Sequence, residues 1–90
     1  MSGPLSPEDL LDFPCHYTFK AVGESGLRFS TDISAAVGLY AVVHQDAINI
    51  RASGKGNYQS VSIIVRLDCY QQLIDIYAEM KSVSGLKMLL

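Results

Sequence analysis

Cysteine and histidine are the residues of this chain best suited to redox, metal or nucleophilic chemistry, and it has two of each. Cys15 and Cys69 are far apart and form no C-x-x-C pair, so their spacing predicts neither a zinc site nor a disulfide framework. His16 adjoins Cys15, but no acid or second histidine is placed to complete a nucleophilic site, and His44 lies in a loop without a partner. We therefore interpret both cysteines as reduced, inert thiols. A redox pair or thiolate nucleophile built from them is the alternative.

The acidic residues also predict no catalytic site. Asp75 and Glu79 share one face of a predicted helix, where exposure to solvent is the ordinary explanation for two neighbouring carboxylates. We expect no catalytic residues, no metal and no cofactor, and the chain is predicted not to be an enzyme.

Charge and hydropathy limit the partners of the chain. Seven Lys and Arg against nine Asp and Glu give a net charge of −2, which argues against binding nucleic acid or anionic membranes through bulk attraction. No apolar run approaches the roughly 20 residues that span a bilayer. The first residues lack the basic start and apolar stretch of a signal peptide, so the chain is predicted to be cytoplasmic.

The length of 90 residues is enough for one domain and too short for two. All three prolines, Pro4, Pro7 and Pro14, lie at the N-terminal end beside Ser, Gly and acidic residues. We predict a flexible N-terminal arm over residues 1–12 and a single domain over residues 13–90.

Alternating apolar and polar residues predict strands over residues 15–22, 47–53 and 60–67, with a last short strand over residues 86–90. The second and third of these strands form a hairpin around Gly54-Lys55-Gly56-Asn57, because glycine and asparagine tolerate positive φ.

Helical spacing of apolar residues predicts two helices, one through Phe29, Ile33, Ala36, Val37 and Tyr40 and one through Leu73, Ile76, Tyr77 and Met80. Ser30 or Thr31 is the expected N-cap of the first helix, with Asp32 in its first turn. Asp68 and Gln71 are expected to form a capping box that starts the second helix.

The order strand, helix, strand, strand, helix, strand predicts an α+β, ferredoxin-like βαββαβ sandwich. Right-handed crossovers place the first and third strands in the middle of a four-stranded antiparallel sheet, with both helices on one face. The second and fourth strands are then exposed edges.

The open face of this sheet is the first candidate site. None of the nine acids falls within a predicted strand, so the face is cationic although the chain is acidic. Alternation places these residues on it: Lys20, Arg51, Arg66 and Lys87, with His16, Thr18, Asn49, Ser62, Ile64 and Leu89. A platform for an anionic partner is the functional hypothesis, and a solvated face with long basic side chains is the ordinary one. A third possibility is that the acidic arm, with Glu8, Asp9 and Asp12, folds over the face.

RNA binding by this face is not favoured, because RNA-recognition domains of the same topology stack bases on aromatic residues of the two central strands. Among the outward positions of those strands here, His16 alone carries an aromatic ring.

The hairpin is the second candidate site, since Lys55 and Asn57 could bind a phosphate there with backbone N–H groups, and Tyr58 could line a pocket. It lacks the spacing of a P-loop, and a plain turn is the favoured interpretation.

Three segments together carry a family resemblance: residues 11–23 (LDFPCHYTFKAVG), residues 54–61 (GKGNYQSV), and Ile76-Tyr77 with the ending LKMLL. The chain resembles the YbeD-like family of small bacterial proteins, whose biochemical function is not established. The resemblance implies a ferredoxin-like fold similar to the ACT-type regulatory domains that bind small metabolites. It also implies a cytoplasmic regulatory or binding role with no assigned ligand. The family's usual Pro-Ser-Ser before Lys55 is Ala52-Ser53-Gly54 in this chain, which weakens a binding role for the loop.

The leading hypothesis is therefore a non-catalytic regulatory or binding module that recognises a protein partner or a small anionic metabolite. A homodimer in which the edge strands pair or the sheets pack face to face, with apolar contacts from Ile64 and Leu89, is the main alternative. A thiol-redox protein using Cys15 and Cys69 is a third possibility.

Overall fold

A computed structural model describes residues 11–90 of the chain, so most of the predicted arm, including Glu8 and Asp9, lies outside the described residues. The elements are β1 (Cys15–Glu24), α1 (Leu27–Gly38), β2 (Ile48–Ser53), β3 (Tyr58–Leu67), α2 (Tyr70–Lys81) and β4 (Leu86–Leu89). Two short 3-10 turns, η2 (Gln45–Ala47) and η3 (Gly54–Gly56), stand at the two ends of β2.

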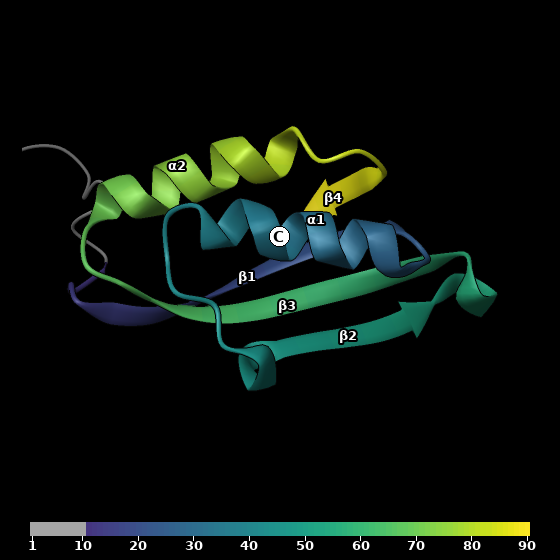
Figure 1. Ribbon diagram of the computed structural model, residues 1–90, viewed down its shortest axis with the longest axis horizontal. Helices are drawn as coiled ribbons and strands as arrows, with labels where there is room; N and C mark the ends of the chain where they lie inside the picture. The colour runs from purple at the N-terminus through teal and green to yellow at the C-terminus, as the bar shows by residue number, and fades with distance from the viewer. Residues whose placement is uncertain (1–10) are drawn as a thin grey trace, which may run out of the picture.

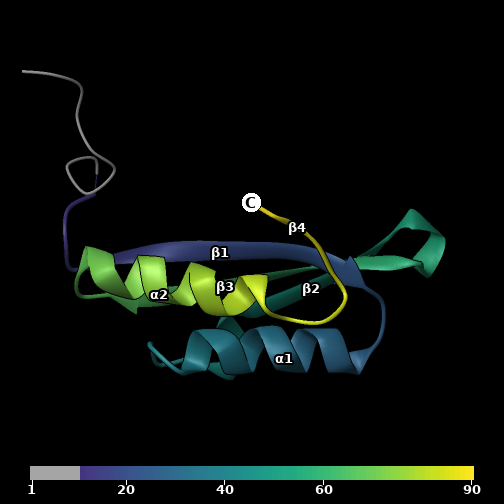
Figure 2. The ribbon, with the colours of Figure 1, turned by 90° about the horizontal axis from the view of Figure 1, so that it is seen from above.

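The sheet is antiparallel with the order β2-β3-β1-β4, and both helices lie on one side of it (Figure 1). The predicted ferredoxin-like α+β sandwich is confirmed, including the central positions of β1 and β3. Seen from above, the hairpin tip at η3 extends beyond the helices (Figure 2).

The core lies between the helices and the two central strands. Alternation in β1 and β3 directs every second side chain toward the helices, where these apolar residues become buried. The buried set comprises Phe19, Ala21, Val61, Ile63, Val65 and Leu67 from the strands and Phe29, Ile33, Ala36, Val37, Leu73, Ile76 and Met80 from the helices.

A cluster of three aromatic rings joins β1 to α2. Phe19 packs edge-to-face against Tyr17 and Tyr77, with ring centroids 4.9 and 5.0 Å apart. The Tyr17 and Tyr77 hydroxyls are 3.0 Å apart, and the Tyr77 hydroxyl also donates to the Leu90 carbonyl at 3.2 Å. Burial, together with the Tyr17 hydroxyl, raises the pKa of Tyr77, so this phenol keeps its proton and its hydrogen bonds beyond the pH at which tyrosine usually ionises.

Both predicted helix starts are wrong. Helix α1 begins at Leu27 with Gly26 as N-cap, because Gly26 adopts a φ of 113° and lets the chain turn before the apolar pattern starts. Ser30 lies inside the helix and its hydroxyl donates to the Leu27 carbonyl at 3.0 Å. Helix α2 has Cys69 as its N-cap instead of Asp68.

The last strand also differs from the prediction. Its register with β1 shifts, so that Leu86 pairs with Gly23 while Met88 pairs with Val22 and Leu89 with Ala21. Leu89 therefore packs on the core side and Met88 takes its expected place on the open face. Lys87 lies at the shift and has no partner in the register, so alternation does not assign it to the open face.

Candidate functional site

The open face of the sheet is built from every second residue of β1, β2 and β3, and the register sets these side chains in cross-strand rows. Lys20 forms a row with Ser62 and Asn49, and Arg51 forms the next row with Ser60 and Val22. Strand β1 is longer than predicted and ends at Glu24, which places one acid at the far end of this face, opposite Tyr58. Apart from Glu24, the described rows carry no acidic residue.

Lys20, on the central strand β1, and Arg51, on the edge strand β2, are two neighbouring cations of the open face. They lie on β1 and β2, one row apart, so their Cα atoms are separated by about 12 Å. The small hydroxyl side chains of Ser60 and Ser62 lie between them. Neither cation forms an ion pair with any other described residue. Two long cationic side chains over a polar floor can both reach one anionic group.

Arg66 stands apart from these two cations. It pairs with His16 at the opposite end of β1, about 14 Å along the strand from the Lys20 row. Its guanidinium Nε lies 3.4 Å from Asp68 Oδ1, and both side chains are exposed. The structure therefore does not place all four predicted cations in one patch. Lys20 and Arg51 lie one row apart, Arg66 lies two rows from Lys20, and Lys87 has no partner in the register.

The hairpin residues form a separate feature at the end of the sheet. Gly54, Lys55 and Gly56 all have positive φ, and Asn57 closes the turn by donating its backbone N–H to the Gly54 carbonyl at 3.1 Å. Lys55 and Asn57 are exposed, and Tyr58 is half-exposed at the first position of β3. Residues 55 and 57 lie at the turn, away from the Lys20 and Arg51 rows.

A hollow that the sequence did not reveal lies beside the end of β3. Strand β2 pairs with β3 from Ile48 opposite Ile63 onward, so residues 64–67 pair with β1 on one side and with no strand on the other. The connection between α1 and β2 runs along this free edge, and the space between them is a groove of about 980 Å³ that we call the notch. These residues line it: His16, Gly38, Tyr40, Ala41, Val42, His44, Asp46, Ala47, Ile64, Val65, Arg66, Asp68 and Gln72.

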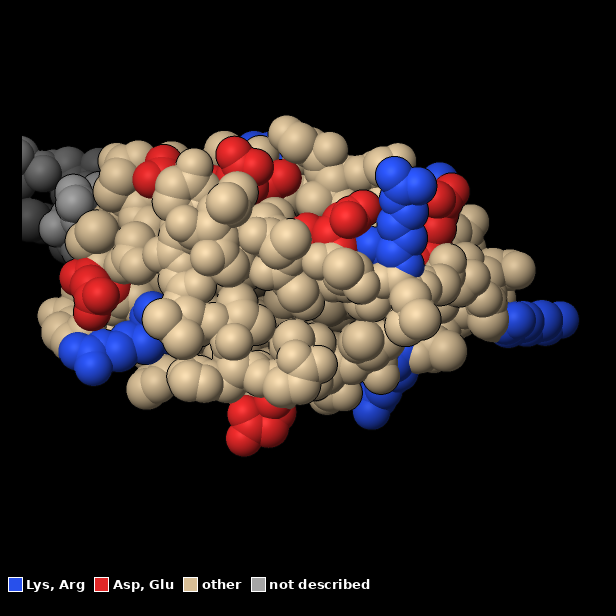
Figure 3. All heavy atoms as spheres, viewed as in Figure 1, with Lys and Arg blue, Asp and Glu red and all other residues tan. Residues whose placement is uncertain are grey.

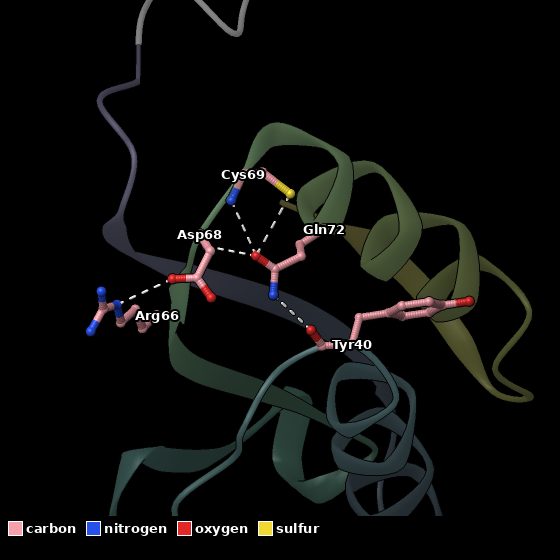
Figure 4. A network of polar contacts seen from close by, with 5 residues as sticks. All are labelled: Tyr40, Arg66, Asp68, Cys69 and Gln72. Carbon is pink, nitrogen blue, oxygen red and sulfur yellow. Dashed lines mark hydrogen bonds and ion pairs between the residues drawn. The ribbon is translucent and has the colours of Figure 1, made fainter.

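One glutamine fixes the end of the notch (Figure 4). The Gln72 side-chain oxygen accepts hydrogen bonds from the backbone N–H groups of Asp68 and Cys69 at 2.6 and 3.2 Å. Its amide nitrogen donates to the Tyr40 carbonyl at 2.8 Å. The start of α2 is thereby tied to the connection that follows α1. The expected partner Gln71 instead donates to Asp75 at 2.9 Å.

The two cysteines lie at the starts of β1 and α2. Cys15 is half-buried at the start of β1, and Cys69 is exposed at the start of α2 with its sulfur 4.0 Å from the Gln72 side-chain oxygen. Cys15 pairs with Leu67, two residues before Cys69, and both thiols are free. Within residues 11–90, no group of three or more His, Cys, Asp or Glu side chains is placed to hold a metal ion.

Charge on the helix side of the molecule is mixed. Acidic and basic side chains both occur there, some of them side by side, on a surface that is largely uncharged (Figure 3). Arg28 and Asp32 of α1 form an exposed pair one helical turn apart, at 3.8 Å. None of the helices in the described range is long and apolar enough to cross a membrane.

The fold is similar to that of an ACT domain of known structure. The ACT domain of GTP pyrophosphokinase from Chlorobium tepidum has a similar fold, with a TM-score of 0.66 at 12% identity over 83% of this chain and 94% of that domain. The solution structure of protein HP0495 from H. pylori is similar over 98% of both chains, with a TM-score of 0.72 at 10% identity. At such low identity the likeness concerns the fold alone.

The family follows from sequence similarity. Residues 8–90 match the family described as "Protein of unknown function (DUF493)", and the chain belongs to this family. A UPF0250 protein from Pasteurella multocida is 35% identical over 92% of this chain and 93% of its own length. Another from Haemophilus ducreyi is 35% identical over 92% of this chain and 84% of its own length. The resemblance to the YbeD-like family is confirmed.

Proposed function

We propose that this protein is a non-catalytic regulatory or binding module whose open sheet face contacts an anionic region of a partner protein. The observation that carries the proposal is the pair Lys20 and Arg51, two cations without an ionic partner among the described residues, on a face that no helix covers. An acidic chain that carries two neighbouring basic residues on one surface favours anionic partners at that surface.

The shape of the face favours a protein over a small metabolite. Small-molecule sites are concave and bury most of the ligand. The notch and a second hollow, between α1 and the C-terminal end of α2, are both lined without Lys20 or Arg51. A broad surface with separated charges suits a macromolecular contact. The ACT-like fold supports this role, because in GTP pyrophosphokinase it occurs as a domain of a larger enzyme.

Reversing the charges of Lys20 and Arg51 tests the proposal. We expect the variant Lys20→Glu plus Arg51→Glu to bind its partner at least about tenfold more weakly than the wild type, because attraction becomes like-charge repulsion. Partners captured from lysate by each form would be quantified by mass spectrometry, followed by affinity measurement with the purified partner at two salt concentrations.

The matched control is Arg28→Glu plus Lys81→Glu. It changes the net charge by the same amount as the test variant, but on the two helices instead of the open face. Equal capture by both double variants would contradict the proposal. Binding of small metabolites is tested separately, by measuring whether any member of a panel of anionic metabolites raises the Tm of the protein. Stabilisation by a metabolite, lost on reversal of Lys20 and Arg51, would show that the face binds a small molecule instead.

A homodimer through β2 is a second candidate, which one observation favours. Every residue of β2 after Ile48 is exposed, although Ile50 is on the helix side of the sheet and pairs with the buried Val61. Ile50 remains 49% exposed because β2 is an edge strand that lies away from both helices (Figure 1). An edge strand with an uncovered apolar residue is a surface on which a second copy can pair.

The dimer candidate predicts a concentration-dependent mass. Light scattering would report a dimer that Ile50→Lys converts to a monomer, because the lysine puts a charge at the centre of the paired edge. Asn49→Lys, on the other face of the same strand, is the matched control for charge. A monomeric wild type at millimolar concentration would exclude the dimer.

A further inference from the structure

We infer that residues 64–67 of β3, at the notch, bind an extended segment of a partner protein as an added β-strand. This peptide site rests on the proposed function in one respect only, which is that the partner is a protein. It differs from the open-face contact in its location and in its reliance on backbone hydrogen bonds.

The free backbone edge of β3 is the first reason. Backbone groups of successive strand residues point alternately to the two neighbouring strands. Two of residues 64–67 therefore direct their N–H and C=O groups away from β1 and into the notch. No backbone hydrogen bond joins these residues to the connection 39–47 beside them. Unpaired backbone groups on an edge are a template for strand addition.

The space beside this edge is the second reason. The chain ahead of β2 would continue along β3 if it were extended, but the η2 turn at Gln45–Ala47 bends it away. The volume of about 980 Å³ that remains lies at the upper end of the range for ligand pockets. Four residues of extended chain need a length of about 13 Å, which matches the four unpaired residues of β3.

The side chains around the notch specify the segment. On the open face, Arg66 would lie opposite one residue of the added strand, and an acidic residue there would form a cross-strand ion pair. The existing contact of Arg66 with Asp68 is exposed, and a guanidinium has donors enough for a second carboxylate.

On the helix side, the residues of the added strand next to this acid would lie beside Val65 and the apolar wall formed by Tyr40, Ala41 and Val42. The segment is therefore an acidic residue flanked directly by apolar residues, in extended conformation.

A short synthetic peptide tests this site without knowledge of the natural partner. The probe is an acetylated and amidated Thr-Val-Glu-Val-Thr, titrated into the full-length isotope-labelled protein while backbone amide shifts are followed by NMR. We expect shifts at residues 64–67 and 40–47. A peptide with lysine in place of glutamate should bind about fivefold or more weakly. A peptide with an N-methylated glutamate should not bind, because Arg66 directs its backbone groups away from β1 and the glutamate opposite it could no longer donate its N–H.

Two pairs of variants separate the notch from general surface effects. Arg66→Glu should weaken the glutamate peptide about fivefold or more, whereas Arg28→Glu should not, although each arginine contacts one exposed aspartate. Val42→Trp should obstruct the notch, and Leu27→Trp adds the same ring at another exposed apolar position. All four sites are exposed, so folding should survive, as amide dispersion would show.

Several outcomes would overturn the notch site. The first is the absence of amide shifts at millimolar peptide, and the second is shifts confined to the outer edge of β2. The third is a wild-type dimer that Val42→Trp dissociates, because a second copy of the chain would then fill the notch. Retention of the captured partner by Arg66→Glu and Val42→Trp, with loss by Lys20→Glu plus Arg51→Glu, would reject the notch and leave the proposed function intact.

Discussion

Replacing Gly23 with alanine should lower the free energy of unfolding by about 3 kcal/mol. A methyl group at this position would point directly into the ring of Phe29, whose nearest atoms are Cζ, Cε1 and Cε2. Gly23 and Phe29 are both buried, so neither the strand nor the ring can move into solvent to relieve the overlap. Urea denaturation followed by circular dichroism would measure the loss.

A glycine elsewhere in the chain provides the control. Gly38, the last residue of α1, has nothing closer than Val43 Cγ2 at 3.9 Å from an added Cβ. Gly38→Ala should therefore leave stability unchanged or raise it by up to about 1 kcal/mol, through the better helix propensity of alanine. Equal losses for both alanine variants would show that backbone freedom, and not the Phe29 ring, explains the effect at Gly23.

A double-mutant cycle isolates the contact. Phe29→Ala alone destabilises the core by about 3–5 kcal/mol, and in that background Gly23→Ala should cost much less than in the wild type. The cycle would thus show that the Phe29 ring of α1 packs against β1 at Gly23, where the strand has no side chain. An additive cycle would contradict the close approach of Phe29 to the sheet.

Periodicity predicted the sheet and the helices because it depends on burial, which acts on every residue of an element. The start of α1 and the faces of the β4 residues depend instead on local backbone geometry, which periodicity does not predict. Helix α1 gains its first turn from the positive φ of Gly26, in a segment that has no apolar repeat. One unpaired residue in β4 exchanges the faces of Met88 and Leu89, since side chains alternate with a period of two.

The candidate sites were also predicted in part by periodicity and in part depend on geometry that the sequence does not show. Alternation placed Lys20, Arg51 and Arg66 on the open face, and the register confirms that placement. The distance of Arg66 from the other two cations depends on which rows the residues occupy, and the sequence does not contain that register. The notch depends on where β2 starts along β3. The η2 turn sets this point, and no apolar pattern marks it.

Gln59 is the other residue whose role only the structure reveals. It is 5% exposed, and its side-chain amide donates to the carbonyls of Glu24 and Gly26 at 2.7 and 2.6 Å. The Glu24 carbonyl is at the end of β1, and the Gly26 carbonyl is in the short link from β1 to α1. This link also contacts the hairpin, because the Ser25 N–H donates to the Asn57 carbonyl at 3.3 Å. One side chain thus holds the link in place against β3.

Gln59→Glu should therefore lower the free energy of unfolding at neutral pH by about 3 kcal/mol or more. The ionised carboxylate has no donor, and it would face two carbonyl oxygens in a buried site. These surroundings raise the pKa of the introduced carboxyl in the folded state above its value in the unfolded state. The folded state then holds the proton more tightly, so the penalty is greatest above the folded-state pKa and shrinks as pH falls through it.

Urea titrations of the wild type and the variant between pH 4 and pH 8 would measure this dependence as a difference in unfolding free energy. Gln59→Leu is the control, because it removes the same two hydrogen bonds without adding a titratable group, and its penalty should be independent of pH. If the Gln59→Glu penalty were equally flat with pH, the carboxyl would be solvated. The amide of Gln59 would then not be the group that holds the β1–α1 link.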